Sequence, residues 1–146
     1  MTDPLQVVVH RPGRAVSLTM PSDLALVGDA VELVARHCDV GILSPRRLQF
    51  NLRTAVAEVL ANAIAYGNRS DASKRVTVDI TCRHEGVRIV VADDGAGFDP
   101  SRVPDPTEPQ NLGREDGRGL FVLRHLVDRV EFNERGNSVC LELRAG

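Results

Sequence analysis

EVLANAIAYGN, residues 58–68, ends the longest helix that the sequence predicts. Ser44-Pro45 has the order of N-cap and proline that is typical of a helix start, and Gly67-Asn68 is typical of a helix end. Between these signals the apolar residues fall on a single stripe: Leu48, Leu52, Ala55, Val56, Val59 and Ala63. A stripe of this kind predicts that one face of the helix lies in the core.

Two polar residues, Glu58 and Asn62, lie one helical turn apart along the edge of this stripe. A cleft beside the core would open at that edge. A carboxylate there can accept a proton, and an amide oxygen is a suitable ligand for Mg²⁺. The alternative is a helix with two polar residues at its rim, and this segment taken alone favours that alternative.

A second polar segment, VVADDGAGFDP at residues 90–100, begins at the end of a predicted strand. Asp93 follows the strand directly, while Gly95 and Gly97 let the backbone turn sharply and approach a ligand closely. A carboxylate fixed there can accept a hydrogen bond from an exocyclic amino group such as that of adenine. A plain acidic turn and a calcium loop are the alternatives, although the ligand spacing of an EF-hand is absent.

A third segment, GREDGRGLFVL at residues 113–123, holds Gly117 and Gly119 at the expected start of a helix, with Arg118 between them and Arg114 upstream. Free backbone N–H groups and the helix dipole make such a start an anion site, to which arginine adds charge. The alternative is a flexible loop. Neither a Walker sequence nor a G-x-G-x-x-G after a strand occurs, so a nucleotide would be bound by a different fold.

The rest of the chain predicts an α+β fold. Apolar alternation between turn signals predicts strands at residues 5–10, 14–20, 75–82, 87–92, 129–134 and 138–143. Helices are expected at residues 22–38, 45–67 and 119–130. Antiparallel hairpins and helices segregated in this way predict a two-layer sandwich. No linker is apparent, so a single domain is expected over residues 1–146.

Composition limits the classes of partner. The 146 residues carry a net charge of −2, which gives no basic excess for nucleic acid. No apolar run approaches the roughly 18 residues of a membrane span, and the first residues do not resemble a signal peptide. Three widely spaced cysteines, Cys38, Cys82 and Cys140, form neither a disulfide set nor a metal pattern. We therefore expect a cytoplasmic protein with buried free thiols.

Taken together, the three segments follow a specific order: Glu-x-x-x-Asn on a helix, Asp-x-Gly-x-Gly after a strand, a proline-rich stretch, then Gly-x-Gly. This order resembles the GHKL superfamily of histidine-kinase-like ATPases, and most of all its short bacterial anti-sigma factor serine/threonine kinases. The resemblance covers almost the whole chain, including NERGN and DPTEPQNLGREDGRGLF. It implies the GHKL ATP-binding fold, in which about three helices cover one face of a mixed, mainly antiparallel sheet.

The resemblance implies ATP and Mg²⁺ as cofactors and a role for each segment. Glu58 would act as general base or orient the attacking hydroxyl, and Asn62 would coordinate Mg²⁺. Asp93 would read the adenine amino group, with Gly95 and Gly97 shaping the pocket.

The implied lid and second glycine box span residues 99–119. Gly117 and Gly119 would lie against the phosphates, and either Arg114 or Arg118 would add charge there. Four prolines exclude regular structure from most of the lid: Pro100, Pro104, Pro106 and Pro109.

The implied substrate is a serine or threonine of a small anti-anti-sigma protein, and the implied competing partner is a sigma factor. Related proteins are often dimers, which leaves a homodimer open. The chain departs from larger members because it lacks a phosphoacceptor-histidine domain and has a short lid. Two alternatives remain: an ATP-binding switch without kinase activity, and a catalytic fragment of a histidine kinase.

Overall fold

A six-stranded sheet forms one layer of the protein in the computed structural model, which describes residues 4–11, 15–95 and 115–146. The strands are β1 (Gln6–Arg11), β2 (Ala15–Pro21), β3 (Arg75–Arg83), β4 (Gly86–Asp93), β5 (Arg129–Phe132) and β6 (Ser138–Arg144). They lie in the order β1-β2-β3-β4-β6-β5, and each neighbouring pair is antiparallel. The predicted hairpins are therefore confirmed, and no parallel pair occurs among these six strands.

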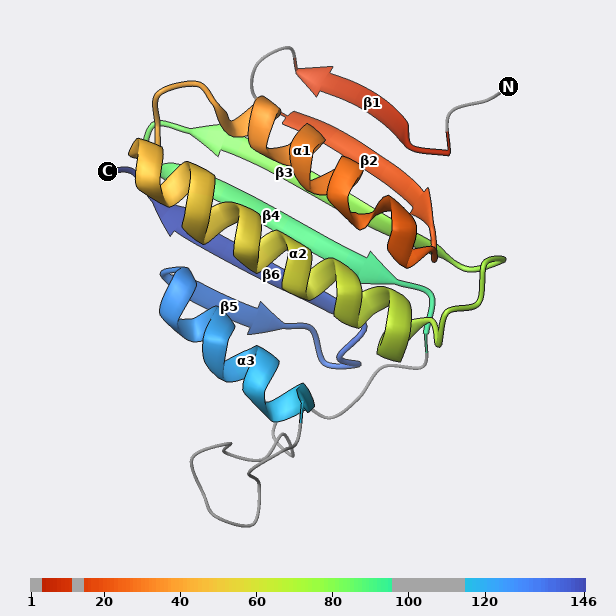
Figure 1. Cartoon of the computed structure of the whole chain (residues 1–146). Coiled ribbons are helices and arrows are strands. Elements are labelled where there is room, and N and C mark those ends of the chain that lie inside the picture. The colour runs from red at the N-terminus through yellow and green to blue at the C-terminus, as the bar shows by residue number, and fades with distance from the viewer. Residues whose placement is uncertain (1–3, 12–14, 96–114) are drawn as a thin grey trace.

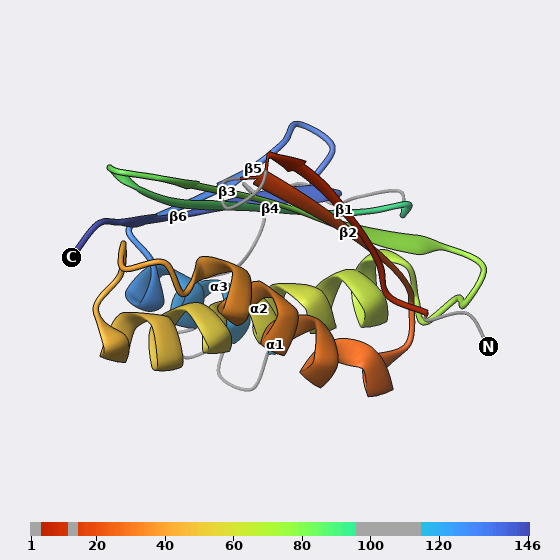
Figure 2. The same ribbon diagram turned by 90° about the horizontal axis from the view of Figure 1, so that it is seen from above.

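Three helices form the second layer, on one side of the sheet (Figures 1 and 2). They are α1 (Val27–Cys38), α2 (Arg53–Asn62) and α3 (Glu115–Leu126). The middle helix, α2, packs against both α1 and α3. The predicted α+β sandwich, with about three helices on one face, is confirmed.

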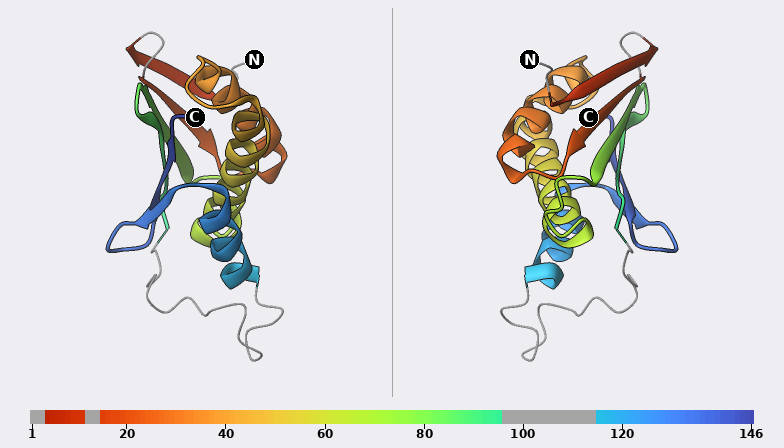
Figure 3. Two further views of the ribbon diagram at one scale, coloured as in Figure 1. Left: turned by 90° about the vertical axis from the view of Figure 1, so that its left-hand side faces the viewer. Right: turned by 90° about the vertical axis from the view of Figure 1, so that its right-hand side faces the viewer.

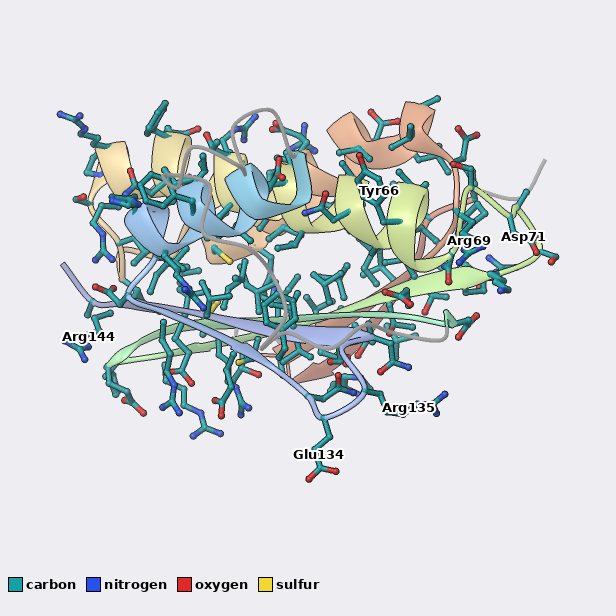
Figure 4. The ribbon with its side chains drawn as sticks, turned by 90° about the horizontal axis from the view of Figure 1, so that it is seen from below. Tyr66, Arg69, Asp71, Glu134, Arg135 and Arg144 are labelled. Carbon is teal, nitrogen blue, oxygen red and sulfur yellow. The ribbon has the colours of Figure 1, made fainter. Side chains whose placement is uncertain are left out.

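Apolar and polar residues alternate along the strands, which explains why helices cover only one face of the sheet. In β3 the buried side chains are Val76, Val78, Ile80 and Cys82, which alternate with more exposed residues. The helices supply large buried partners such as Leu52, Leu60 and Ile64, none of which is exposed to solvent. The sheet face away from the helices (Figure 3) carries mainly polar side chains (Figure 4), and there Ser17 bridges His10 on β1 and Asp79 on β3. Burial of apolar area therefore holds the two layers together.

The helix predicted over residues 45–67 is confirmed as one continuous helix, but its ends differ from an ideal α-helix. π-helical turns, η2 (Arg47–Leu52) and η3 (Ala63–Gly67), flank α2. At the second of these, the Asn68 backbone N–H donates to the Ala63 carbonyl at 2.8 Å, a five-residue span. Such wider turns are frequent at functional sites. They change which residues face the sheet, so the exact face could not be read from a regular 3.6-residue period.

The prediction of a third helix over residues 119–130 is wrong at both ends. The described helix α3 begins at Glu115, so Gly117 and Gly119 lie within its first turns. It ends at Leu126 because the chain then joins the sheet: the Asp128 backbone N–H donates to the Glu142 carbonyl at 2.9 Å. No glycine or proline signals this end in the sequence.

The state of the cysteines and the length of the helices can be compared with the expectations from the sequence. All three cysteines are free; Cys38 and Cys82 are buried with their sulfur atoms 4.0 Å apart, whereas Cys140 is only partly buried. The contact with Cys82, together with burial, raises the pKa of the Cys38 thiol. None of the helices in the described ranges is long and apolar enough to cross a bilayer.

The Asp128 carboxylate links the end of α3 to two other elements by hydrogen bonds, and its contribution to the stability of the fold should depend on pH. It accepts hydrogen bonds from the Arg144 backbone N–H at 2.7 Å and from the Arg47 guanidinium at 2.6 Å. The Arg144 N–H first, and then Arg47, hold the pKa of Asp128 below its usual value. A carboxyl group whose pKa is lower in the folded protein than in the unfolded chain stabilises the fold at any pH above its pKa in the unfolded chain. This stabilisation is lost as the pH falls through the pKa of the group in the folded protein.

Asp128→Asn should therefore lower the free energy of unfolding by about 1 kcal/mol at pH 7, a modest value because the side chain is 34% exposed. The difference from the parent should shrink below about pH 4, near the unfolded pKa of aspartate. Urea unfolding between pH 3 and pH 7 measures it. Glu134→Gln, at the tip of the β5–β6 hairpin (Figure 4), is the control and should show no such loss. A difference that is constant with pH would contradict this role of the charge.

Candidate functional site

Glu58 and Asn62 lie side by side on α2, as their spacing predicts. Both are half-buried, and the Asn62 amide Nδ2 donates to Glu58 Oε1 at 3.3 Å. This bond presents the carboxylate and the amide as a pair rather than as two separate rim residues. The Asn62 amide nitrogen is used within the pair, while its oxygen is the atom suited to a metal ion.

Helix α3 brings Gly119 against this pair. Gly119 is buried, and a Cβ atom added there would lie 2.2 Å from Glu58 Oε1 and 3.3 Å from Asn62 Nδ2. Any other residue at this position would therefore displace the Glu58 side chain or move the helix. The helix begins four residues before Gly119, whose missing side chain allows close approach to Glu58. The anion site that the sequence predicts at this helix start stays a prediction.

Asp93 lies at the end of β4 and forms the second part of the candidate site. Its Oδ1 accepts a hydrogen bond from the Gly95 backbone N–H at 2.8 Å. Burial raises the pKa of Asp93; the Gly95 bond opposes this effect, and the neighbouring Asp94 charge adds to it. The carboxylate is thus held in a tight turn in which its charge is only partly compensated.

Gly67, at the end of η3, packs directly on this carboxylate. A Cβ atom at Gly67 would lie 2.3 Å from Asp93 Oδ2, and one at Gly95 would lie 2.0 Å from the Gly67 carbonyl oxygen. The two glycines and Asp93 therefore form one close contact between helix and strand. The sequence identified Gly67 only as a helix end, and no local pattern indicates that it contacts Asp93.

The long helix contacts both parts of the candidate site: it carries Glu58, and its end at Gly67 packs on Asp93. Glu58 and Gly67 are nine residues apart, which corresponds to roughly 13 Å at the rise of an α-helix. The polar pair at one point and the half-buried Asp93 carboxylate at the other match a ligand with a charged end and a hydrogen-bonding end. The first two predicted segments are thus brought to one helix, and the third joins them through Gly119.

The remaining predicted residues are only partly described. Gly97, Arg114 and most of the expected lid lie outside the described residues. Gly117 and Arg118 lie on α3, where only the backbone is described. Within the described ranges no group of three or more His, Cys, Asp or Glu side chains gathers as a metal site, and residues 96–100 of the calcium-loop alternative lie outside these ranges.

Comparison with known proteins supports the family resemblance. The family model described as the histidine kinase-like ATPase domain matches residues 20–143. A serine-protein kinase RsbW from Oceanobacillus iheyensis is 29% identical over 91 residues, which cover 58% of this chain and 58% of the relative. An anti-sigma F factor from Clostridium perfringens is 31% identical over 90 residues, which cover 60% of this chain and 64% of the relative. The chain thus matches less than two thirds of the length of these relatives.

Gly67→Ala should test the contact between helix and strand. The new methyl group would overlap the Asp93 carboxylate, which cannot easily move because the side chain is short and is held by Gly95. The free energy of unfolding should therefore fall by roughly 1–3 kcal/mol, the usual cost of overpacking. Gly28→Ala is the matched control because nothing lies within 4 Å of its added Cβ. The free energy of unfolding of this control should instead rise by roughly 0.5 kcal/mol, because alanine lowers the entropy of the unfolded chain. Urea unfolding measures both changes.

A double-mutant cycle would assign the loss to Asp93. In an Asp93→Ala background the overlapping atoms are gone, so Gly67→Ala should cost clearly less than in the parent. An equal cost in both backgrounds would show that the strain arises elsewhere.

Proposed function

Because this chain belongs to the histidine kinase-like ATPase family, we propose that it is an ATP-dependent serine/threonine protein kinase that acts as an anti-sigma factor. Its substrate would be a serine or threonine of a small anti-anti-sigma protein, and it would sequester a sigma factor. The names of the relatives, serine-protein kinase and anti-sigma F factor, support this assignment. A homodimer is part of the same proposal.

The observation that carries the proposal is the contact of Glu58 with both Asn62 and Gly119. Phosphoryl transfer needs little covalent help from a protein, since positioning and charge stabilisation supply most of the rate. A carboxylate beside an amide oxygen, with a helix backbone closed against it, fits this requirement. A pure nucleotide switch has no need of a carboxylate next to the metal ligand.

Asp93 fits the recognition of the adenine base. Its carboxylate is half-buried, and its Oδ1 accepts from Gly95, so Oδ2 would accept from the exocyclic amino group. Gly67 and Gly95 lack side chains, which lets the turn that carries Asp93 lie directly against the end of the helix. Gly97 would extend the same pocket.

Asn62 fits a Mg²⁺ ion that is held mainly by the nucleotide. Mg²⁺ usually keeps several waters and takes one or two protein oxygens with substrate phosphates, so a single amide oxygen is sufficient. When bound, ATP supplies the phosphoryl group, and Mg²⁺ neutralises charge on its phosphates. We propose Gly117, Gly119 and either Arg114 or Arg118 as further phosphate contacts.

Glu58 would orient the acceptor hydroxyl and take its proton as the oxygen attacks. The Asn62 amide fixes the carboxylate through Oε1, so Oε2 would face the substrate. Gly119 lets the carboxylate lie directly against α3, because a Cβ at this position would lie 2.2 Å from Glu58 Oε1. These contacts would keep the general base in one orientation before the substrate arrives.

Asp93→Asn should weaken ATP binding without weakening the fold. Loss of a charged hydrogen-bond acceptor costs on the order of 1.5–3 kcal/mol, roughly ten- to hundredfold in affinity. Burial of this carboxylate opposes folding at neutral pH, as its raised pKa indicates, so the neutral variant should be at least as stable as the parent. Calorimetric titration with ATP and GTP, together with urea unfolding, tests both statements. ATP binding at parental affinity would exclude Asp93 as the adenine contact.

Glu58→Gln should slow transfer while leaving the fold and ATP binding intact. The amide keeps the size of the side chain and can still accept the Asn62 bond, but it cannot take a proton. Transfer should therefore slow by roughly 10²–10⁴-fold, the usual contribution of a general base. Single-turnover transfer from labelled ATP to a small single-domain acceptor that is expressed with this protein measures the rate.

Asn62→Ala is the matched comparison, because loss of the metal ligand should weaken nucleotide binding as well as transfer. Transfer by Glu58→Gln at the parental rate would reduce Glu58 to a rim residue. A parent that binds ATP but phosphorylates no co-purifying protein would favour the switch without kinase activity.

A further inference from the structure

Asn68 is the most completely buried polar side chain in the described part of the chain, with no exposed surface. It follows directly after η3 and Gly67. An amide taken out of water costs stability unless its hydrogen-bonding groups are satisfied. The partners of Asn68 therefore indicate why an asparagine is buried here rather than an apolar residue.

The side chain of Asn68 joins three segments that are distant in sequence. Its Oδ1 accepts from the Asp94 backbone N–H at 2.8 Å. Its Nδ2 donates to Ser22 Oγ at 2.7 Å and to the Arg75 carbonyl oxygen at 3.0 Å. One amide thus connects the end of β2, the start of β3 and the turn after β4.

The turn at residues 93–95 is also held by other groups. The Asp94 carboxylate accepts from the Arg75 backbone N–H at 2.8 Å. On the other side, the Asn137 carbonyl accepts from the Asp93 N–H at 2.9 Å, and its side chain donates to the Gly95 carbonyl at 3.4 Å. Of these bonds between described residues, only the one that Asn68 Oδ1 accepts from the Asp94 N–H ties the turn to the end of the long helix.

We propose that Asn68 is a positioning residue for nucleotide binding, which fixes the Asp93 carboxylate by holding the Asp94 N–H. This inference rests on the proposed nucleotide site at Asp93. A carboxylate that accepts a hydrogen bond from the amino group of a ligand binds that ligand more tightly when its position is fixed before the ligand arrives. Without the Asn68 acceptor, the Asp94 N–H loses its partner among the described residues, and the turn can rearrange and move Asp93 away from the base.

The test compares Asn68→Ala with two controls by titration with ATP and with GTP. In Asn68→Ala the dissociation constant for ATP should rise about tenfold, and the preference for ATP over GTP should narrow. Ser22→Ala removes a bond from the same buried cluster but leaves the Asn68 bond to the turn. Val34→Ala lowers stability from the core of α1, far from the turn. Both controls should unfold at lower urea concentration yet bind ATP within about twofold of the parent.

The outcomes separate this inference from the function on which it rests. If the parent and Ser22→Ala bind ATP and Asn68→Ala binds it equally well while unfolding more easily, Asn68 is only structural and the inference is overturned. If the parent itself binds no ATP, the proposed function fails first.

A measurement on the parent protein covers the case in which Asn68→Ala does not fold. Amide exchange at Asp94 without nucleotide should be slowed by at least about 100-fold relative to the unfolded chain, since its N–H is bonded to a buried group. Exchange near the rate of the unfolded chain would mean that the turn is not held before binding, and would overturn the inference.

Discussion

Where the long helix ends, its backbone at Gly67 lies so close to the Asp93 carboxylate that no side chain fits between them. This contact sets the distance between the helix layer and the end of β4. It also excludes every residue except glycine at Gly67 and Gly95 without a shift of the turn. The adjacent Asn68 then holds the same turn by hydrogen bonds. The position of the candidate site relative to the core depends on this junction of helix and strand.

The layered core supplies the rigidity that such a junction requires. Apolar side chains from β3, β4 and β6 face the helices, and the large ones among them are almost wholly buried. The proposed catalytic pair lies along the edge of the central helix, where burial gives way to partial exposure. Glu58 and Asn62 can therefore be held by packing on one side and still meet a ligand on the other.

Much of this could be predicted from the sequence because it follows from local rules. The two-residue period of the strands and the apolar stripe of the long helix predicted the elements and the α+β sandwich. The four-residue spacing of Glu58 and Asn62 predicted that they would share one face, and the structure joins them by a hydrogen bond. The Asp-x-Gly-x-Gly pattern placed a carboxylate in a tight turn directly after a strand. Their roles towards ATP and Mg²⁺ stay predictions.

Other features depend on contacts between distant segments, and the sequence could not give them. The π-helical turns and the true ends of α3 arise from packing and from bonds such as that of Asp128 to β6. Gly67 and Asn68 looked like an ordinary helix end, and only the fold brings them to Asp93 and Asp94. The sequence by itself determined the elements and the polar residue types, because backbone propensity and periodicity act over a few residues. The tertiary structure alone decided which of these residues meet, because the distances between segments are set by the packing of the whole core.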